Sequence, residues 1–368
     1  MTRFAVPVTK PHLPRRAKLD HYLDTIYESG WLTNDGPLVK ELTRRLRSHL
    51  GVDHLLLVAN GTLALQVAYR ALGVTAGPEA ARPEAVTTPF SFVATSSSLA
   101  WEGVSPVFAD IDAESWCLDA ARVEAAITER TKAIVAVHVF GNPCDVGRLD
   151  GIAKRHGLKV IYDGAHAFGV SLDGMSLLRH GDATTLSFHA TKPFHTIEGG
   201  AIVFERREHL ERAKRLINFG IVGHEKVDGI GINAKMNEFQ AAMGLCVLDE
   251  MDTVLEGRER VWKSYQSGLA ERVQLQRRPA GSTDNYGYFP LLLASEAHAR
   301  DTLAELWSEG LMARRYFAPS LDTLSYLDHS GPMEISRDVA SRVLCLPVYG
   351  DVPADAVDAC IEIVARNA

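Results

Sequence analysis

The stretch Ser187-Phe188-His189-Ala190-Thr191-Lys192-Pro193 places a lysine just beyond an expected strand at Thr184 to Phe188 and directly before a proline. Proline disfavours helical backbone at the residue before it, so Lys192 is expected in extended or turn backbone. A lysine in such a partly desolvated place loses its proton more readily, and its neutral amine can attack an aldehyde to form an imine. Taken alone, however, Lys192 is better explained as a surface lysine.

Two features beside Lys192 favour a ligand site over a surface lysine. Ser187 offers a hydroxyl group to an anionic ligand. Glu198-Gly199-Gly200 supplies backbone that a ligand can approach without obstruction by Cβ atoms. The segment around Lys192 is therefore a candidate site for a ligand that carries both an aldehyde and an anionic group.

Short apolar runs alternate with helix-like stretches through the first two thirds of the chain. This alternation predicts an α/β fold with a mostly parallel sheet. The further expected strands are Leu55 to Ala59, Ala85 to Thr88, Ala133 to Phe140, Lys159 to Tyr162 and Ala201 to Phe204. Thr62 to Leu72 is an expected helix capped by Thr62, and apolar residues at helical spacing from Met236 predict a helical stretch to about Lys263.

Composition limits the function classes. A chain of 368 residues with 46% apolar and 23% charged residues is expected to fold into two domains. The formal net charge of −7 argues against a nucleic-acid binder. The five cysteines are widely spaced without a C-x-x-C pair, which fits neither a disulfide framework nor a zinc site, and no apolar run approaches bilayer-spanning length. We therefore expect a cytoplasmic protein without membrane contact.

A second motif, Asp163-Gly164-Ala165-His166, follows the expected strand that contains Tyr162. Open α/β sheets bind ligands at the carboxyl ends of their strands, so Asp163 lies at a suitable position. A carboxylate there could keep a pyridine nitrogen protonated, and His166 could reach another substituent of the ring. Asp before Gly is also common turn chemistry, and for Asp163 in isolation that is the simpler interpretation.

Two further motifs suit parts of a phosphorylated planar ligand. Asn60-Gly61-Thr62, between a strand and a helix, presents amide N–H groups and a hydroxyl where a helix N-terminus favours phosphate. Phe92 in Pro89-Phe90-Ser91-Phe92 follows a strand end, where an aromatic ring could cover the face of a cofactor. A plain turn and core packing are the respective alternatives.

Together and in this order, the motifs resemble the DegT-like nucleotide-sugar aminotransferases, which are fold-type I pyridoxal phosphate (PLP) enzymes. The resemblance covers nearly the whole chain, and its most specific stretch is S-F-H-A-T-K-P-F-H-T-I-E-G-G-A, Ser187 to Ala201. The other matching segments are 29–33, 36–39, 60–62, 90–95, 163–166, 233–238 and 314–319.

The resemblance implies an aspartate-aminotransferase-like fold. In this fold, residues 1–250 would form a large PLP-binding domain with a mostly parallel sheet sandwiched by helices. Residues 251–368 would form a smaller C-terminal α+β domain. The active unit would be a homodimer with shared active sites, because Asn233 would reach the phosphate of the neighbouring subunit's cofactor.

The resemblance also implies a role for each site residue. Lys192 would be the Schiff-base lysine, Asp163 would pair with the pyridinium and His166 would lie near the ring oxygen. The other implied cofactor contacts are Phe92 stacked on the ring, and Gly61, Thr62 and Ser187 at the phosphate. The implied nucleotide-sugar contacts are Trp31, Thr33, Tyr316 and Phe317, and no metal is expected.

Within the family, a histidine three residues before the lysine together with a downstream E-G-G is similar to enzymes that aminate C4 of the hexose. The segment F-H-A-T-K is most similar to the corresponding segment of enzymes that make dTDP-4-amino-4,6-dideoxyglucose. The expected reaction is transfer of an amino group from L-glutamate to a nucleotide-linked 4-keto-6-deoxyhexose. A C3-directed sugar or aminocyclitol aminotransferase is the alternative inside the family, and the presence of Lys192 disfavours the branch that dehydrates sugars with His at that position.

Three alternatives lie outside the family. Gly229-x-Gly231-x-x-Ala234 fits the G-x-G-x-x-A pattern of nicotinamide oxidoreductases, but no convincing strand precedes it and it occurs late in the chain. A metal enzyme would need histidines whose spacing matches no closed ligand set; the candidates are His138, His166, His189 and His195. A catalytically silent binding protein that kept the cofactor is the third, and retention of lysine, aspartate and phosphate ligands together disfavours it.

Overall fold

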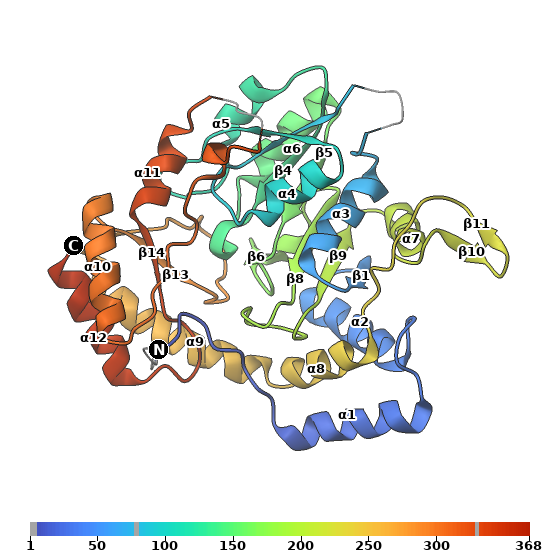
Figure 1. Cartoon of the computed structure of the whole chain (residues 1–368), viewed down its shortest axis with the longest axis horizontal. Coiled ribbons are helices and arrows are strands. Elements are labelled where there is room, and N and C mark those ends of the chain that lie inside the picture. Colours follow the sequence, from blue (N-terminus) through green and yellow to red (C-terminus); the bar gives the residue numbers. More distant parts are fainter. Residues whose placement is uncertain (1–5, 77–80, 328–330) are drawn as a thin grey trace.

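A seven-stranded sheet forms the centre of the molecule in a computed structural model that describes residues 6–76, 81–327 and 331–368 (Figure 1). The strand order is β1-β9-β8-β5-β4-β2-β3, and only β9 runs antiparallel to its neighbours. The sheet strands are β1 (Leu55–Val58), β2 (Glu84–Thr87), β3 (Ser105–Phe108), β4 (Thr131–Val137), β5 (Lys159–Asp163), β8 (Ala183–Ser187) and β9 (Gly200–Phe204). The predicted α/β fold with a mostly parallel sheet is confirmed.

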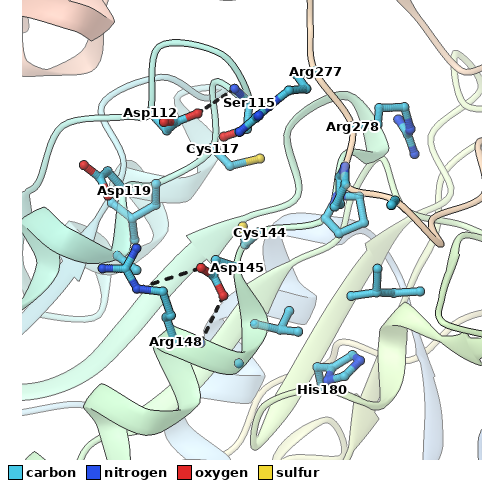
Figure 2. Close-up of a pocket in the computed structure, with 18 of the residues that line it drawn as sticks. Asp112, Ser115, Cys117, Asp119, Cys144, Asp145, Arg148, His180, Arg277 and Arg278 are labelled. Atoms are coloured by element: carbon cyan, nitrogen blue, oxygen red, sulfur yellow. Dashed lines mark hydrogen bonds and ion pairs between the residues drawn. The ribbon is translucent and has the colours of Figure 1, made fainter.

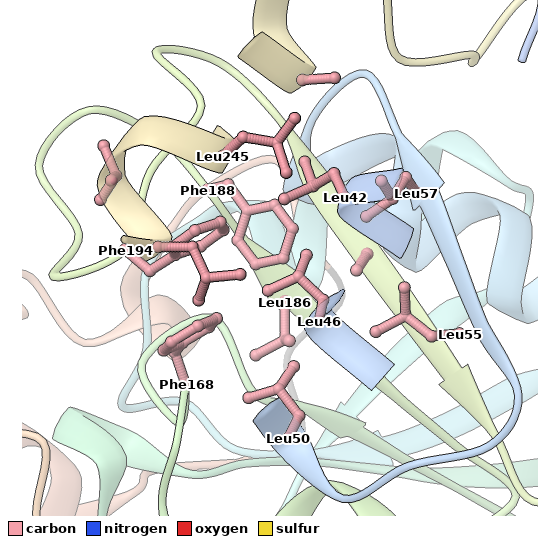
Figure 3. Close-up of a cluster of buried hydrophobic side chains, with 14 of the residues drawn as sticks. Leu42, Leu46, Leu50, Leu55, Leu57, Phe168, Leu186, Phe188, Phe194 and Leu245 are labelled. Atoms are coloured by element: carbon pink, nitrogen blue, oxygen red, sulfur yellow. The ribbon is translucent and has the colours of Figure 1, made fainter. Parts of the chain in front are cut away.

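Helices cover both faces of this sheet because successive strand residues point to opposite sides. Leu55 and Leu57 of β1 pack in a cluster with α2 (Pro37–Leu50) and α8 (Glu238–Leu248), where Leu42, Phe188 and Leu245 meet (Figure 3). Leu56 and Val58 pack on the opposite face with α3 (Gly61–Leu72) and α7 (Arg207–Leu216). The sheet is therefore buried on both faces, as the unbroken apolar runs predict.

Further helices and hairpins surround the sheet. They are α1 (Arg16–Ser29), α4 (Ala94–Trp101), α5 (Ala120–Val123), α6 (Val146–His156), the hairpin β6 (Ser171–Leu172) with β7 (Met175–Ser176), and the hairpin β10 (Ile221–Gly223) with β11 (Lys226–Val227). Short 3-10 turns occur at Glu124–Ala126, Val139–Gly141, Leu177–Arg179 and Leu321–Thr323. None of the helices in the described residues combines the length and the apolarity needed to cross a bilayer.

A smaller antiparallel sheet follows in the last third of the chain. Its strands are β12 (Gln274–Leu275), β13 (Phe289–Leu292) and β14 (Val343–Leu346), and its helices are α9 (Met251–Leu269), α10 (Glu296–Ser308), α11 (Glu334–Arg342) and α12 (Ala354–Arg366). Val6 packs in the core of this unit, where its N–H donates to the Gly310 carbonyl at 3.2 Å and its carbonyl accepts from the Met312 N–H at 2.9 Å. The domain division at residues 250 and 251 stays a prediction.

Three local expectations differ from the structure. The cap of α3 is Asn60 and not Thr62, because the Asn60 side chain accepts a hydrogen bond from the Leu63 N–H at 2.8 Å. The long helix expected from Met236 is two helices, since α8 ends at Leu248 and α9 begins at Met251. The strand expected to reach Phe140 ends at Val137, where the backbone turns and places Phe140 in the left-handed region with φ 57°.

His138 is a fully buried histidine just beyond β4. Its Nδ1 accepts a hydrogen bond from the Cys144 N–H at 3.2 Å, and its ring stacks on Tyr162 with centroids 4.5 Å apart. The Nε2 atom has no hydrogen-bond partner in the described part of the chain. Burial, with a smaller contribution from nearby His180, lowers the pKa of His138 to about 3.

We predict that His138→Asn makes the protein less sensitive to acid. The unfolded chain binds a proton at His138 below its ordinary pKa of 6.5, whereas the folded chain does so only near pH 3, so this group removes stability as the pH falls between these values. The variant should lower the pH dependence of the free energy of unfolding by about 1.4 kcal/mol per pH unit. Urea denaturation between pH 4 and 7 measures this, with exposed His224→Asn as control; equal slopes for wild type and His138→Asn would contradict it.

Candidate active site

Lys192 lies in the turn between β8 and β9, where its N–H donates to the His189 carbonyl at 2.9 Å. The side chain is partly buried, and its Nζ donates a hydrogen bond to the Tyr288 hydroxyl at 2.9 Å. Burial lowers the pKa of Lys192 to about 8, although the negative charge of Asp163 opposes this shift. About a tenth of such amines are neutral at pH 7, against about one in 3,000 for an ordinary lysine. Lys192 is thus prepared for nucleophilic chemistry.

Asp163 ends β5 and is buried. Its Oδ2 accepts from the Thr95 hydroxyl at 2.8 Å, and its Oδ1 accepts from the Ala165 N–H at 3.1 Å. Burial raises the pKa of Asp163, while these two hydrogen bonds and the charge of Lys192 act in the opposite direction. A buried carboxylate held in this way fits a cationic ring nitrogen, whose charge would favour the ionised form of Asp163.

The His166 ring is buried inside an aromatic cluster. It lies parallel to Phe317 and Phe140, with centroids 5.7 and 6.1 Å away, and tilted against Tyr288 at 4.6 Å. Its Nδ1 accepts from the Phe140 N–H at 3.1 Å, so the neutral ring carries its proton on Nε2. Burial, reinforced by the charge of Lys192, lowers the pKa of His166 well below its usual value. His166 is therefore a neutral donor beside Lys192.

The predicted phosphate ligands Gly61 and Ser187 lie against each other. A Cβ atom on Gly61 would come within 2.9 Å of the Ser187 Cβ, so only glycine leaves this cradle open. Asn60 binds the Leu63 N–H, whereas helix geometry leaves the amides of Gly61 and Thr62 without partners inside α3. Thr62 is exposed at the same helix terminus. These donors fit a phosphate group.

Phe92 and Asn233 are both exposed. Phe92 follows β2 with 59% of its surface accessible, which leaves its ring free to contact a ligand. Asn233 lies next to Ala234, whose carbonyl accepts from the Ala59 N–H at 2.9 Å, so it adjoins the start of α3. The predicted roles of both residues stay predictions.

The predicted substrate residues fall into two groups. Tyr316 and Phe317, between α10 and α11, belong to the aromatic cluster around Lys192: Tyr316 meets Tyr288 edge to face at 6.0 Å, and Phe317 is buried against His166. Trp31 and Thr33 lie on the exposed loop between α1 and α2. This loop is attached to α8, not to the cluster, because the Leu32 carbonyl accepts from the Glu238 N–H at 3.0 Å.

Glu238 is a buried carboxylate at the start of α8. Its two oxygens accept from the Leu38 and Val39 N–H groups of α2 at 2.8 and 3.0 Å. A Cβ on Gly36 would lie 2.6 Å from both Glu238 and the Trp31 ring, so the loop closes tightly over this contact. Glu238 thus holds the segment that carries Trp31 and Thr33.

We predict that Glu238→Gln lowers the free energy of unfolding by about 2 kcal/mol, because an amide has only one oxygen for two buried N–H donors. Thermal denaturation measures this, with the exposed Glu256→Gln as control, for which the change should stay within about 0.5 kcal/mol. Equal melting temperatures for the two variants would contradict the assigned role.

Sequence reasoning missed several residues of this site. Tyr288, Phe140 and Asn285 carry no motif of their own, and Thr95 lies in a family motif that assigns it no role. The Asn285 side chain donates to the carbonyls of His166 and Phe168 at 2.8 and 2.9 Å, which ties the segment after Asp163 to the segment before β13. The sequence around Asn285, Thr283-Asp284-Asn285-Tyr286-Gly287, has only the composition of a turn and carries no local sign of these contacts.

A cavity of about 790 Å³ lies elsewhere, at the start of α6 (Figure 2). Its arginines already have acidic partners: Arg277 contacts Glu114 at 2.9 Å, and Arg278 contacts Asp284 at 3.4 Å. Lys192, Asp163 and His166 are not among its lining residues. The shifted groups of this cavity are Cys144, whose pKa burial raises, and His180, whose pKa burial lowers, and neither lies with Lys192.

Two of the alternatives outside the family, the nicotinamide oxidoreductase and the metal enzyme, have no matching geometry in the described residues. Gly229 to Ala234 lies between the hairpin strand β11 and α8, so it is not the strand-to-helix turn that binds dinucleotides. Two of the histidines considered for a metal bind ordinary partners: the His195 ring contacts the His12 carbonyl at 2.8 Å and the His189 ring contacts the Thr191 hydroxyl at 2.8 Å. Neither arrangement supports a nicotinamide or metal enzyme.

Comparison with known proteins identifies a family and several relatives of this chain. The family model of the DegT/DnrJ/EryC1/StrS aminotransferases matches residues 15–365. The chain is 42% identical over 364 residues to a dTDP-4-amino-4,6-dideoxy-D-glucose transaminase of Shigella dysenteriae, with 97% of each chain covered. A protein of the same name from Escherichia coli is 36% identical over 368 residues, with 96% of each chain covered.

A solved structure of a related protein is also similar to this chain. The crystal structure of DesI in the presence of its TDP-sugar product is 35% identical and superposes with a TM-score of 0.91, covering 98% of this chain and 92% of that chain. The resemblance drawn from the motifs and the aspartate-aminotransferase-like fold are confirmed. The chain belongs to the DegT/DnrJ/EryC1/StrS aminotransferase family.

Proposed function

We propose that this protein transfers the amino group of L-glutamate to C4 of a dTDP-linked 4-keto-6-deoxyhexose, with PLP as cofactor. The observation that carries the proposal is the partly buried Lys192 close to Asp163 and His166, in a chain whose relatives include two dTDP-4-amino-4,6-dideoxy-D-glucose transaminases. The pKa of Lys192 near 8 gives it a usable neutral fraction at physiological pH.

When bound, PLP supplies an electron-withdrawing ring that stabilises negative charge on a substrate carbon that loses its proton. The groups of this chain then have separate tasks. Lys192 would move that proton at Nζ, Asp163 would keep a proton on the ring nitrogen, and His166 would donate a hydrogen bond from Nε2 to the oxygen carried by the ring. Gly61, Thr62 and Ser187 would hold the phosphate and Phe92 would cover the ring. The residues that would contact the nucleotide sugar are Trp31, Thr33, Tyr316 and Phe317.

The proposal includes a homodimer in which Asn233 reaches the partner's cofactor phosphate. Its support is a run of exposed apolar side chains around the hairpin β10–β11, next to the exposed Asn233. These side chains are Phe219, Ile221, Val222, Val227, Ile230 and Ile232. Exposed apolar side chains gathered in one segment suit contact with a second copy. A cytoplasmic location is also proposed, supported by five cysteines that are all buried and free of disulfides.

An absorbance spectrum of the cofactor-loaded protein tests the function. L-Glutamate should change the cofactor band, and dTDP-4-keto-6-deoxyglucose should restore it, with a 4-amino sugar detected by mass spectrometry and NMR. A response to glutamate that only a 3-keto sugar or a keto-cyclitol reverses would place the enzyme in the alternative branch. Absence of any cofactor band would overturn the proposal.

A further inference from the structure

The hydroxyl group of Tyr288 is the hydrogen-bond partner of Lys192. The two atoms lie 2.9 Å apart, and Tyr288 comes from the segment just before β13, which belongs to the smaller sheet. Burial raises the pKa of Tyr288, so its hydroxyl stays protonated at physiological pH. Asp163, His166 and Tyr316 are further titratable groups that interact electrostatically with Lys192.

A hydroxyl group can form a hydrogen bond with Lys192 in both charge states of the lysine. It accepts a hydrogen bond from the ammonium form, and it donates one to the lone pair of the neutral amine. A carboxylate could partner only the ammonium, and it would raise the pKa of Lys192. Lys192 needs both states if it takes up and returns a proton during each turnover.

The position of Tyr288 is fixed from three directions. Its carbonyl accepts from the Trp262 indole N–H at 3.0 Å. Its ring packs against His166 and Phe140, with centroids 4.6 and 5.3 Å away. Asn285, which is 2% exposed, binds the Gly287 N–H through Oδ1 at 3.1 Å and the carbonyl of His166 through Nδ2.

We propose that Tyr288 is a positioning residue for Lys192. The Tyr288 hydroxyl holds the Lys192 Nζ in place in both the protonated and the neutral state of the amine. This inference rests on the proposed function only in taking Lys192 as the reactive amine. It assigns to Tyr288 no contact with the substrate.

Tyr288→Phe tests the inference, with Tyr286→Phe as a matched control. Tyr286 is two residues away, and its hydroxyl donates to Glu259 at 2.9 Å and not to Lys192. The first readout uses the full chain freed of cofactor: acetylation of Lys192 by acetic anhydride is followed by peptide mass spectrometry from pH 6 to 10. Lys192 is partly exposed, so the reagent can reach it.

In Tyr288→Phe the midpoint of Lys192 acetylation should fall by about one pH unit, because the charge-assisted bond to the ammonium is stronger than the bond to the amine. The control should keep the wild-type midpoint. The second readout is kinetic: kcat for Tyr288→Phe should fall about 10- to 100-fold while KM changes less than about threefold.

An unchanged acetylation midpoint would overturn the inference, even if activity fell, because the tyrosine would then act through packing alone. A loss of melting temperature in Tyr288→Phe but not in Tyr286→Phe, together with an unchanged midpoint, would overturn it in the same way. The acetylation readout needs no sugar substrate, so it remains decisive if the proposed sugar transfer fails in the wild type.

Discussion

Lys192→Ala should abolish amino-group transfer, with kcat reduced by about 10⁴-fold or more, because the chain loses both its nucleophile and its proton carrier at one position. The fold should survive. Burial lowers the pKa of Lys192, which means that the folded state does not favour its charge, and removal of the side chain should leave the melting temperature unchanged or higher.

The measurement for Lys192→Ala is product formation from glutamate and the keto sugar, followed by mass spectrometry over hours. Lys154→Ala is the control, since Lys154 is an exposed residue of α6 that forms an ion pair with Asp150 at 2.5 Å. Turnover within tenfold of wild type would remove Lys192 from the mechanism.

Asp163→Asn should lower kcat by about 10²- to 10³-fold while the cofactor remains bound. The amide keeps the shape of the side chain and one oxygen for the Thr95 hydroxyl, but it lacks the charge that keeps a ring nitrogen protonated. The loss therefore falls on the chemical step and not on cofactor affinity.

Spectroscopic titration with PLP measures the affinity of Asp163→Asn, and stopped-flow absorbance with glutamate measures the first half of the reaction. Thr95→Val, which removes one hydrogen bond and retains the carboxylate, should show a smaller loss of about tenfold. Unchanged turnover in Asp163→Asn would exclude a role for this carboxylate in activating the ring.

The sequence predicted every strand of the large sheet except β3, because the other strands are short apolar runs separated by turns, a local signal that packing did not overturn. The prediction from sequence failed where neighbouring residues could fill the same structural role or where no residue marked a break. Asn60 and Thr62 can both cap a helix, and the backbone geometry selects Asn60. The helix expected from Met236 crosses a break at Asp249 and Glu250 that no glycine or proline marks.

The residues of the candidate site also fall into two groups, one predictable from sequence and one not. Lys192, Asp163, His166, Gly61 and Ser187 lie in contiguous motifs, and the structure brings their segments to one edge of the sheet. Tyr288 and Asn285 could not be predicted, because their partners lie about a hundred residues away in the sequence and nothing local records a contact of that range. Composition and periodicity report burial, and they do not identify which buried hydroxyl meets which amine.

The pairing of Val6 with the backbone around Leu311 has a consequence for synthesis on the ribosome. Val6 acquires these neighbours only after the much later segment around Leu311 has emerged. Until then the large sheet can assemble, whereas the apolar face that receives Val6 stays incomplete and exposed to aggregation. Nascent chains arrested before residue 311 should therefore bind chaperones more strongly than chains that have emerged beyond Val364, the last residue of this core.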